Sequence, residues 1–449
     1  MNMFRRLSSR LTVAVAVAAL GGMGLTSGHT TQASTSLDLA SLVVAGNPHP
    51  VHVSVVPGST FPEVSGTTYA YAEEGMCPGA GGGAVCDTTD NIEVWKISGS
   101  GGTLIQTLPT TNQYYSDTTG HPHAAFFGSN WLAYDKKLDC VIVANEGNSG
   151  GADTTFAGSW ESYAVDKSTE KLTLVSNVPD PNDGSGHGPS SVQVVDTKSG
   201  AWVIGSDSFP PSTYGNTLES LPLSSGCKLG NVKQSTGGSG SEGYLNFTIV
   251  SPTRVVANDV LLTTEDTYAL NDSTGALTLV KEAAGDGVTP DGIFVSGSNL
   301  FTGVLGGPPA EVTSGKYTSA SGNVTWDPTS PGKDSSSNAT YAVPVWYDKS
   351  NHIVTGGDER NSAGTGNSLL SNFKIGPGTK ITFANETSLA VPSQLTNDLQ
   401  PLGTGLFLTT IYNGDNELCS EGASGPTNCK TVFTMTNPNG SEEVILASS

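Results

Sequence analysis

Histidines and carboxylates recur at matching places along this chain, beside short runs of β-forming residues. Segments 134–146, 195–207 and 347–359 superpose closely. In each segment an Asp opens a polar turn, and an acid follows eleven residues later: Asp135 with Glu146, Asp196 with Asp207, and Asp348 with Glu359. Since a short polar turn reverses the chain, each segment predicts two antiparallel strands, the second of which ends in an acid.

Polar side chains mark the same strand ends elsewhere in the chain. Second strands end in the pairs Glu73-Glu74, Asn145-Glu146, Ser206-Asp207, Asn258-Asp259 and Asp358-Glu359. First strands begin near His121, His123, His187, Asp291 and Asn397-Asp398. Because the end of the second strand lies beside the start of the first in an antiparallel pair, we expect all of these side chains on one face, the upper face. The short turns between first and second strands then mark the lower face.

These residue types suit hydrolysis at the upper face. A hydrolase needs a base that takes a proton from water and a donor that stabilises the oxyanion. The candidate catalytic residues are His123, Glu146, His187 and Arg360. The candidate substrate-binding residues are His121, Asn145, Asp207 and Asp291. His121 and His123 are expected to point the same way, because residues two apart in an extended segment share a face.

Carboxylates that converge around one opening repel each other, so some of them stay protonated or a cation neutralises them. Oxygen ligands of this kind suit Ca²⁺, and Glu74, Asp259 and Glu359 are the candidate ligands. The competing interpretation is structural, because an acid at a strand end often accepts hydrogen bonds from turn N–H groups. We favour the structural interpretation for most single members of this group, and no other cofactor is indicated.

A repeated hairpin indicates how these residues are positioned. SWESYAVDKSTEKLTLVSNV begins at Ser159 and EDTYALNDSTGALTLVKEA begins at Glu265, with weaker copies from Ile92, Asn372 and Val432. Another pair of strands precedes each hairpin, so the unit is four antiparallel strands in about 40–60 residues, the size of a propeller blade. Seven units follow one another: 47–109, 121–178, 188–235, 243–283, 289–331, 340–391 and 396–449.

The sequence therefore predicts an all-β fold, a seven-bladed β-propeller of four-stranded antiparallel blades over residues 47–449. Helical periodicity is nearly absent. An array of β-sandwiches is the competing architecture, but it does not predict the four-strand period. A closed ring leaves no long exposed edge, and segment 34–46 is a candidate ring-closing strand.

Residues 1–33 are typical of a secretory signal peptide. Arg5, Arg6 and Arg10 precede the short apolar run LTVAVAVAAL, and small residues end at Ala33. No later stretch is long and apolar enough to span a bilayer. The mature chain then has 17 Lys and Arg against 41 Asp and Glu, a net charge of −24. We therefore expect a secreted protein with no membrane anchor and no nucleic-acid partner, since so acidic a chain repels polyanions.

Six Cys in an exported protein indicate disulfides, although six thiols allow 15 pairings. Proximity favours Cys77–Cys86 and Cys419–Cys429, and Cys140–Cys227 is left by elimination. Free buried thiols are the alternative. A metal site with cysteine ligands is poorly supported, because no CxxC spacing occurs.

The blade pattern YAVDKSTEKLTLV, with HPHAA or GPSSV opening the next blade, resembles the lactonase family of seven-bladed propellers. That family includes 6-phosphogluconolactonase-like and carboxymuconate-cyclase-like proteins. The resemblance covers most of the mature chain, is best in the second to fourth blades, and implies a lactonase-like hydrolase. We expect a small neutral lactone or ester as substrate, because the mature chain keeps only Arg254 and Arg360 as arginines, and Arg254 follows a lower-face turn.

The competing hypothesis is a non-catalytic secreted propeller that binds a glycan, a cation or a protein, since propellers host many functions. Tyr214 and Trp160 are candidates for stacking on sugar rings, although Trp160 fits a core position equally well. Whether the chain is an enzyme is therefore left open. In both cases we expect a monomer with a small-molecule or glycan ligand, and turnover of lactones separates the two hypotheses.

Overall fold

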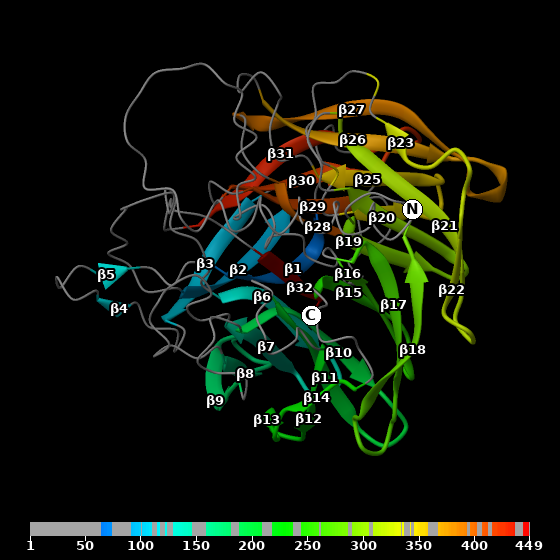
Figure 1. Cartoon of the computed structure of the whole chain (residues 1–449). Helices are drawn as coiled ribbons and strands as arrows, with labels where there is room; N and C mark the ends of the chain where they lie inside the picture. Colours follow the sequence, from blue (N-terminus) through cyan, green and yellow to red (C-terminus); the bar gives the residue numbers. More distant parts are fainter. Residues whose placement is uncertain are drawn as a thin grey trace.

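The computed structural model describes residues 64–73, 91–99, 101–109, 115–116, 122–123, 129–145, 159–180, 188–208, 218–236, 244–259, 262–285, 290–304, 309–333, 335, 342, 345–357, 367–392, 396–401, 406–411, 415–435 and 443–448. Almost all of these residues lie in strands and turns, and the one helix among them is the short 3-10 turn η1 (Pro377–Thr379). No helix in this part of the chain is long and apolar enough to cross a bilayer. The predicted all-β class is confirmed (Figure 1).

Seven antiparallel sheets form the blades of a propeller, which confirms the predicted architecture. The strands of each blade are given in order from the inner to the outer strand. Blade 1 consists of β32 (Glu443–Ser448), β1 (Val64–Glu73), β2 (Asn91–Gly99) and β3 (Gly101–Pro109). Blade 2 consists of β6 (Ser129–Asp135), β7 (Cys140–Asn145), β8 (Ser159–Val165) and β9 (Leu172–Pro179). Blade 3 consists of β10 (Gly188–Asp196), β11 (Ala201–Ser208) and β12 (Leu218–Ser224), and both β13 (Lys228–Leu229) and β14 (Lys233–Gln234) pair with the outer side of β12. Blade 4 consists of β15 (Tyr244–Ser251), β16 (Arg254–Asp259), β17 (Thr264–Leu270) and β18 (Leu277–Ala284).

The remaining three blades follow the same order. Blade 5 consists of β19 (Pro290–Ser296), β20 (Asn299–Val304) and β21 (Glu311–Thr318), and both β22 (Asn323–Trp326) and β23 (Gly332–Lys333) pair with the outer side of β21. Blade 6 consists of β24 (Val345–Asp348), β25 (Ile353–Gly357), β26 (Asn367–Ile375) and β27 (Ile381–Pro392). Blade 7 consists of β28 (Thr396–Pro401), β29 (Leu406–Ile411), β30 (Asp415–Ser420) and β31 (Thr427–Thr434). First strands of most neighbouring blades contact one another, for example β6 with β10 and β15 with β19, so these strands lie around the axis of the ring.

The C-terminal strand closes the ring. β32 pairs antiparallel with β1, from Thr68 opposite Ser448 to Glu73 opposite Glu443, and becomes the inner strand of blade 1. The prediction of a hairpin over 432–448 is wrong, because β31 pairs with β30 in blade 7 whereas β32 belongs to blade 1. The chain's last strand joins the first blade and leaves no open edge there. Segment 34–46 lies outside the described residues, so its ring-closing role stays a prediction.

The repeated hairpins are confirmed as the two outer strands of blades 2 and 4. Both contain a register shift at the same place, before Tyr163 in β8 and before Tyr268 in β17. Asp166 and Asn271 open the two turns, and their side-chain oxygens accept hydrogen bonds from backbone N–H groups two residues later, at 2.8 Å and 3.1 Å. The same turn chemistry and the same bulge explain why these two stretches of sequence are so alike.

A recurring contact ties neighbouring blades together. In three junctions a serine in the third strand of one blade donates a hydrogen bond to a backbone oxygen in the outer turn of the next blade: Ser162 to Cys227 (2.5 Å), Ser220 to Gly275 (2.6 Å) and Ser314 to Thr379 (2.7 Å). The accepting residue has a positive φ each time, at 62°, 73° and 77° respectively. A left-handed residue in the outer turn is therefore part of the joint between blades.

Large side chains fill the spaces between blades. Trp160 of blade 2 is fully buried, and its ring lies so close to Gly205 of blade 3 that an added Cβ would come within 1.7 Å of it. The indole Nε1–H donates a hydrogen bond to Glu219 of blade 3 (3.0 Å). Trp160 is therefore a core residue, and its candidacy for sugar stacking is wrong. Tyr214 lies outside the described residues.

Candidate functional site

The inner strand carries a β-bulge at its upper end in five blades. Register shifts between the first and second strands fall at Ser129/Trp131, Pro189/Ser191, Tyr244/Phe247, Asp291/Ile293 and Thr396/Asp398. A bulge bends its strand and re-aims side chains, and bulges are over-represented next to active sites. The face predicted to be functional therefore has a repeated backbone irregularity around its opening, which sequence spacing did not reveal.

The bulges do not fall at the same position in every blade. The residues opposite the first member of each shift are Asn145 in blade 2, Asp207 in blade 3 and Asp259 in blade 4. Pairing upward from the lower turn is the same in blades 2 and 3, which makes Asn145 equivalent to Ser206 and agrees with the spacing that aligns Glu146 with Asp207. The bulge of blade 3 therefore lies one position nearer the upper end than the bulge of blade 2. In blades 2 to 4 an Asn or Asp lies opposite the start of the bulge.

Asn145 is buried at this position, with 1 % of its surface exposed. Its Nδ2 donates a hydrogen bond to the Ser159 hydroxyl (3.2 Å), whereas its Oδ1 has no hydrogen-bond partner. A buried oxygen without a donor costs about 1–3 kcal/mol. This amide oxygen can accept a hydrogen bond from a hydroxyl group, as its predicted role in binding substrate requires.

Asp259 lies in a buried acidic cluster of blade 4. Its Oδ1 accepts a hydrogen bond from the backbone N–H of Leu262 (2.8 Å), as the structural interpretation of the strand-end acids expects. The neighbouring Asp266 accepts hydrogen bonds from the hydroxyls of Tyr244 (2.6 Å) and Thr264 (3.1 Å). The pKa of Asp266 is raised to about 7, chiefly by burial and also by the charge of Asp259, although the two hydroxyl donors act to lower it.

Five blades hold a buried carboxylate near the start of the third strand, and sequence reasoning missed this set. Its members, all fully buried, are Glu93, Glu161, Glu219, Asp266 and Glu417. The first four accept a hydrogen bond from an aromatic side chain, namely Trp95, Tyr163, Trp160 and Tyr244 respectively, and Glu417 accepts from the backbone N–H of Ala390 in blade 6. For Glu93 and Glu161 the signal in the sequence is an acid two residues before its aromatic partner. The first four carboxylates orient aromatic rings in the core, so we assign them a structural role.

The structure describes some of the other predicted site residues and not the rest. His123 lies in β5 (Pro122–His123), which pairs with β4 (Tyr115–Ser116) outside the four-stranded blades. Asp291 lies opposite Gly303, and Asp207 opposite Pro189, both at the upper ends of their strands. His121, Glu146, His187, Arg360, Glu74 and Glu359 lie outside the described residues. Within the described ranges, no three His, Cys, Asp or Glu side chains form a group that could bind a metal ion. The catalytic and metal assignments stay predictions.

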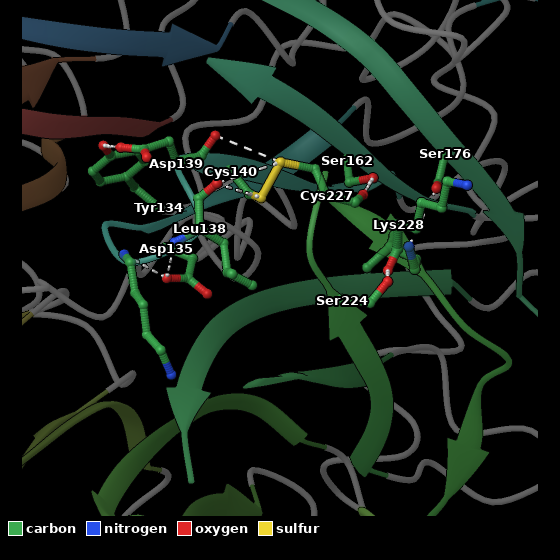
Figure 2. Close-up of a disulfide and its surroundings, with 12 residues drawn as sticks. Tyr134, Asp135, Leu138, Asp139, Cys140, Ser162, Ser176, Ser224, Cys227 and Lys228 are labelled. Carbon is green, nitrogen blue, oxygen red and sulfur yellow. Dashed lines mark hydrogen bonds between the residues drawn. A yellow bond between two sulfur atoms is a disulfide. The ribbon is translucent and has the colours of Figure 1, made fainter. Parts of the chain in front are cut away.

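Two of the expected disulfides are present. Cys140–Cys227 joins β7 of blade 2 to the turn between β12 and β13 in blade 3 (Figure 2). Cys419–Cys429 joins β30 to β31 within blade 7. Cys77 and Cys86 lie outside the described residues, and none of the described cysteines is free. The first of these bonds fixes the junction between the two blades where the family resemblance is strong.

Two of the three Asp residues that open lower-face turns stabilise the turn by accepting backbone hydrogen bonds. Asp135 accepts hydrogen bonds from the backbone N–H groups of Lys137 (2.8 Å) and Leu138 (3.1 Å), and Asp348 does the same with Ser350 (2.7 Å) and Asn351 (3.1 Å). Asp196 differs, because it forms an exposed ion pair with Lys137 of the neighbouring blade (2.9 Å). A small cavity of about 290 Å³ lies beside these turns, lined by Tyr134, Asp135, Lys136, Lys137, Val194 and Asp196. It is separate from the predicted upper-face site.

Comparison with solved structures finds proteins of similar fold. The chain is similar to the periplasmic gluconolactonase of Pseudomonas aeruginosa, with a TM-score of 0.58 and 14 % identity over 85 % of this chain and 99 % of that one. Candidate 6-phosphogluconolactonases from Bacteroides uniformis (TM-score 0.57, 13 % identity, 85 % and 100 % covered) and Bacteroides fragilis (0.56, 12 %, 88 % and 100 %) are similar as well. No protein-family model and no curated protein matches the sequence. The structural likeness confirms the resemblance at the level of the fold: this chain is a seven-bladed propeller, similar in fold to these proteins.

Proposed function

We propose that this protein is an exported lactonase-like hydrolase that opens a small, neutral lactone or ester at the upper face of the propeller. The five inner-strand bulges carry the proposal, because they mark one rim of the ring as the specialised one. The gluconolactonase and the candidate 6-phosphogluconolactonases with the same fold support the reaction class. Fold alone does not define function, so the residues at the rim have to supply the chemistry.

In the proposed reaction, a base among His123, Glu146 and His187 takes a proton from water while the water oxygen attacks the carbonyl carbon of the lactone. Arg360 stabilises the negative charge on the carbonyl oxygen. The ring C–O bond then breaks, and the proton passes to the oxygen that leaves, which yields a hydroxy acid. His121, Asn145, Asp207 and Asp291 bind the hydroxyl groups of the substrate, and Glu74, Asp259 and Glu359 hold Ca²⁺ if a cation takes part.

Export is a second part of the proposal. The buried Cys140–Cys227 bond supports a protein that folds in an oxidising compartment. We expect residues 1–33 to be removed on export. Mass spectrometry of the protein recovered from the culture medium or periplasm of the producing cell should show a chain that begins at residue 34. Recovery of the full-length chain in the cytoplasm would contradict this prediction.

Hydrolysis of a panel of neutral lactones tests the activity. We expect turnover by the wild type, and a loss of about 10²–10⁴-fold in kcat for the His123→Ala or His187→Ala variant that removes the base. Glu146→Gln tests the third candidate in the same way. Asp196→Asn is the matched control, because Asp196 lies at the lower face in an exposed ion pair, and its loss should leave kcat unchanged. No turnover of any lactone would favour the alternative, a non-catalytic propeller that binds a glycan, cation or protein.

A further inference from the structure

The junction between blades 4 and 5 buries three polar side chains from the three inner strands of blade 4. Asn246 of β15, Asn258 of β16 and Glu265 of β17 are each at most 1 % exposed. Asn258 lies directly opposite Glu265 in the pairing of β16 with β17. The bulge that follows Tyr244 brings Asn246 beside Asn258. Side chains opposite each other in an antiparallel pair have Cβ atoms about 4.5–5.5 Å apart. Three oxygen-bearing groups are therefore gathered on one face of the sheet.

That face is turned toward blade 5. Val256, on the same face as Asn258, packs in one cluster with Leu300 and Tyr317 of blade 5. Thr267, which follows Glu265 by two residues, has its hydroxyl 3.4 Å from that of Tyr317. The acidic cluster of Asp259 and Asp266 is on the opposite face of the sheet, where its partner Tyr244 packs with blade 3. The two polar groups of blade 4 are thus separate.

Blade 5 adds hydroxyl oxygens to the junction. Thr302 follows Leu300 by two residues on β20 and shares its face toward blade 4. Its hydroxyl lies 2.5 Å from that of Thr313 on β21, and both residues are at most 1 % exposed. Amide, carboxylate and hydroxyl oxygens from two blades therefore enclose the same buried layer.

The Asn258 amide is the unexplained group of this layer. Both Oδ1 and Nδ2 are buried, and neither has a hydrogen-bond partner. Each unsatisfied buried polar atom lowers the stability of the folded state by about 1–3 kcal/mol, so an amide with two such atoms is strongly destabilising at a core position. Such a group is expected where it binds something that protein atoms alone do not supply.

We propose that the junction between blades 4 and 5 binds a hard cation, Ca²⁺, through the side-chain oxygens of Asn246, Asn258 and Glu265. Ca²⁺ prefers carboxylate and amide oxygens in flexible sets of six to eight. A buried carboxylate is stabilised by a cation at close range, because the low dielectric of the interior strengthens their attraction. The bound ion would join blade 4 to blade 5, with the hydroxyls of Thr302 and Thr313 on the facing side.

Thermal unfolding of the full chain, first treated with a chelator, tests this site. Ca²⁺ added up to 10 mM should raise the Tm by several degrees in a saturable way, as binding to the folded state alone requires. Glu265→Gln, which keeps the shape and removes the charge, should abolish the rise. Asp196→Asn is the control, since Asp196 lies in an exposed ion pair at the lower face, outside both cation sites, and this variant should keep the full rise. No Ca²⁺-dependent rise, or a rise that Glu265→Gln retains in full, would overturn the proposal.

A second variant decides the matter if Glu265→Gln does not fold. Asn258→Asp adds a second carboxylate, so the chelated protein should be less stable than the wild type, and half-saturation should need at least tenfold less Ca²⁺. An Asn258→Asp protein with the same Ca²⁺ response as the wild type would show that this residue is not a ligand. The readout is stability, so the result is independent of whether the protein hydrolyses lactones.

Discussion

Asp266 shows how one side chain makes stability depend on pH. Its pKa is about 7 in the folded protein, against about 3.9 for an unperturbed Asp. The folded state therefore keeps a proton that the unfolded chain loses. The stabilisation is complete below pH 4 and is lost as the pH rises through 7, at roughly 1.4 kcal/mol for each unit between the two pKa values.

We therefore predict that Asp266→Asn flattens part of this pH dependence. The amide keeps an acceptor for Tyr244 and carries no charge, so the variant should lose less stability than the wild type between pH 4.5 and pH 8. Urea unfolding at several pH values measures the difference. Parallel curves for the two proteins would show that Asp266 titrates normally. Glu93→Gln is the comparison variant, because Glu93 is a buried acid of blade 1 that accepts a hydrogen bond from Trp95 of the same strand.

The outer turns show how single elements hold neighbouring blades. Gly275 has φ +73°, and an added Cβ would lie 2.1 Å from the ring of Trp202 in blade 3. Gly226 has nearly the same φ, +72°, but no atom within 4 Å of an added Cβ. Both substitutions to Ala carry the cost of a left-handed residue, about 1–2 kcal/mol. Only Gly275→Ala also overpacks the joint, which adds about 1–3 kcal/mol.

We accordingly predict that Gly275→Ala is more destabilising than Gly226→Ala by about 1–3 kcal/mol. Denaturant unfolding of the two variants measures the difference directly. Because backbone strain is matched, the gap between them reports the contact between blades. Equal losses would mean that Trp202 moves away without cost.

The sequence allows these elements to be predicted better than their contacts. Turn residues such as Asp166 and Asn271 act within a few positions, so hairpins and blade count follow from local patterns. The equal spacing of Glu146 and Asp207 from the lower turns agrees with the pairing register, but the bulges lie one position apart in these two blades, and the spacing gives no sign of that. The partner of Trp160, Glu219, lies 59 residues away in another blade, and no local pattern points to it. At the upper rim, the sequence predicts which side chains mark the strand ends but not the bulges beside them.

For the whole molecule, the two described disulfides should differ in importance. Cys140–Cys227 closes a loop of 87 residues across two blades, whereas Cys419–Cys429 closes one of 10 residues within a blade. Chain entropy predicts that removing the longer bond costs about 2 kcal/mol more. We expect Cys140→Ser with Cys227→Ser to lower the Tm more than Cys419→Ser with Cys429→Ser. Equal shifts would indicate that the constraint on the unfolded chain is not what these bonds contribute.

Removal of residues 443–448 should open the ring. The deletion leaves β1 without its inner partner over six paired positions, from Thr68 to Glu73. An exposed strand edge pairs readily with other chains, so we expect a lower Tm together with concentration-dependent aggregation. Light scattering and thermal unfolding measure the two effects. Loss of Ser449 alone, which lies beyond β32, serves as the control and should change neither.

Because β1 (Val64–Glu73) has β32 (Glu443–Ser448) as its inner partner, blade 1 cannot be completed before residue 448 has been made. The other six blades need no strand from this segment, so each of them can form earlier during synthesis. Among the described strands, closure of the circle is therefore the last step of assembly. A product that ends before residue 443 could complete six blades and would still keep a gap at blade 1.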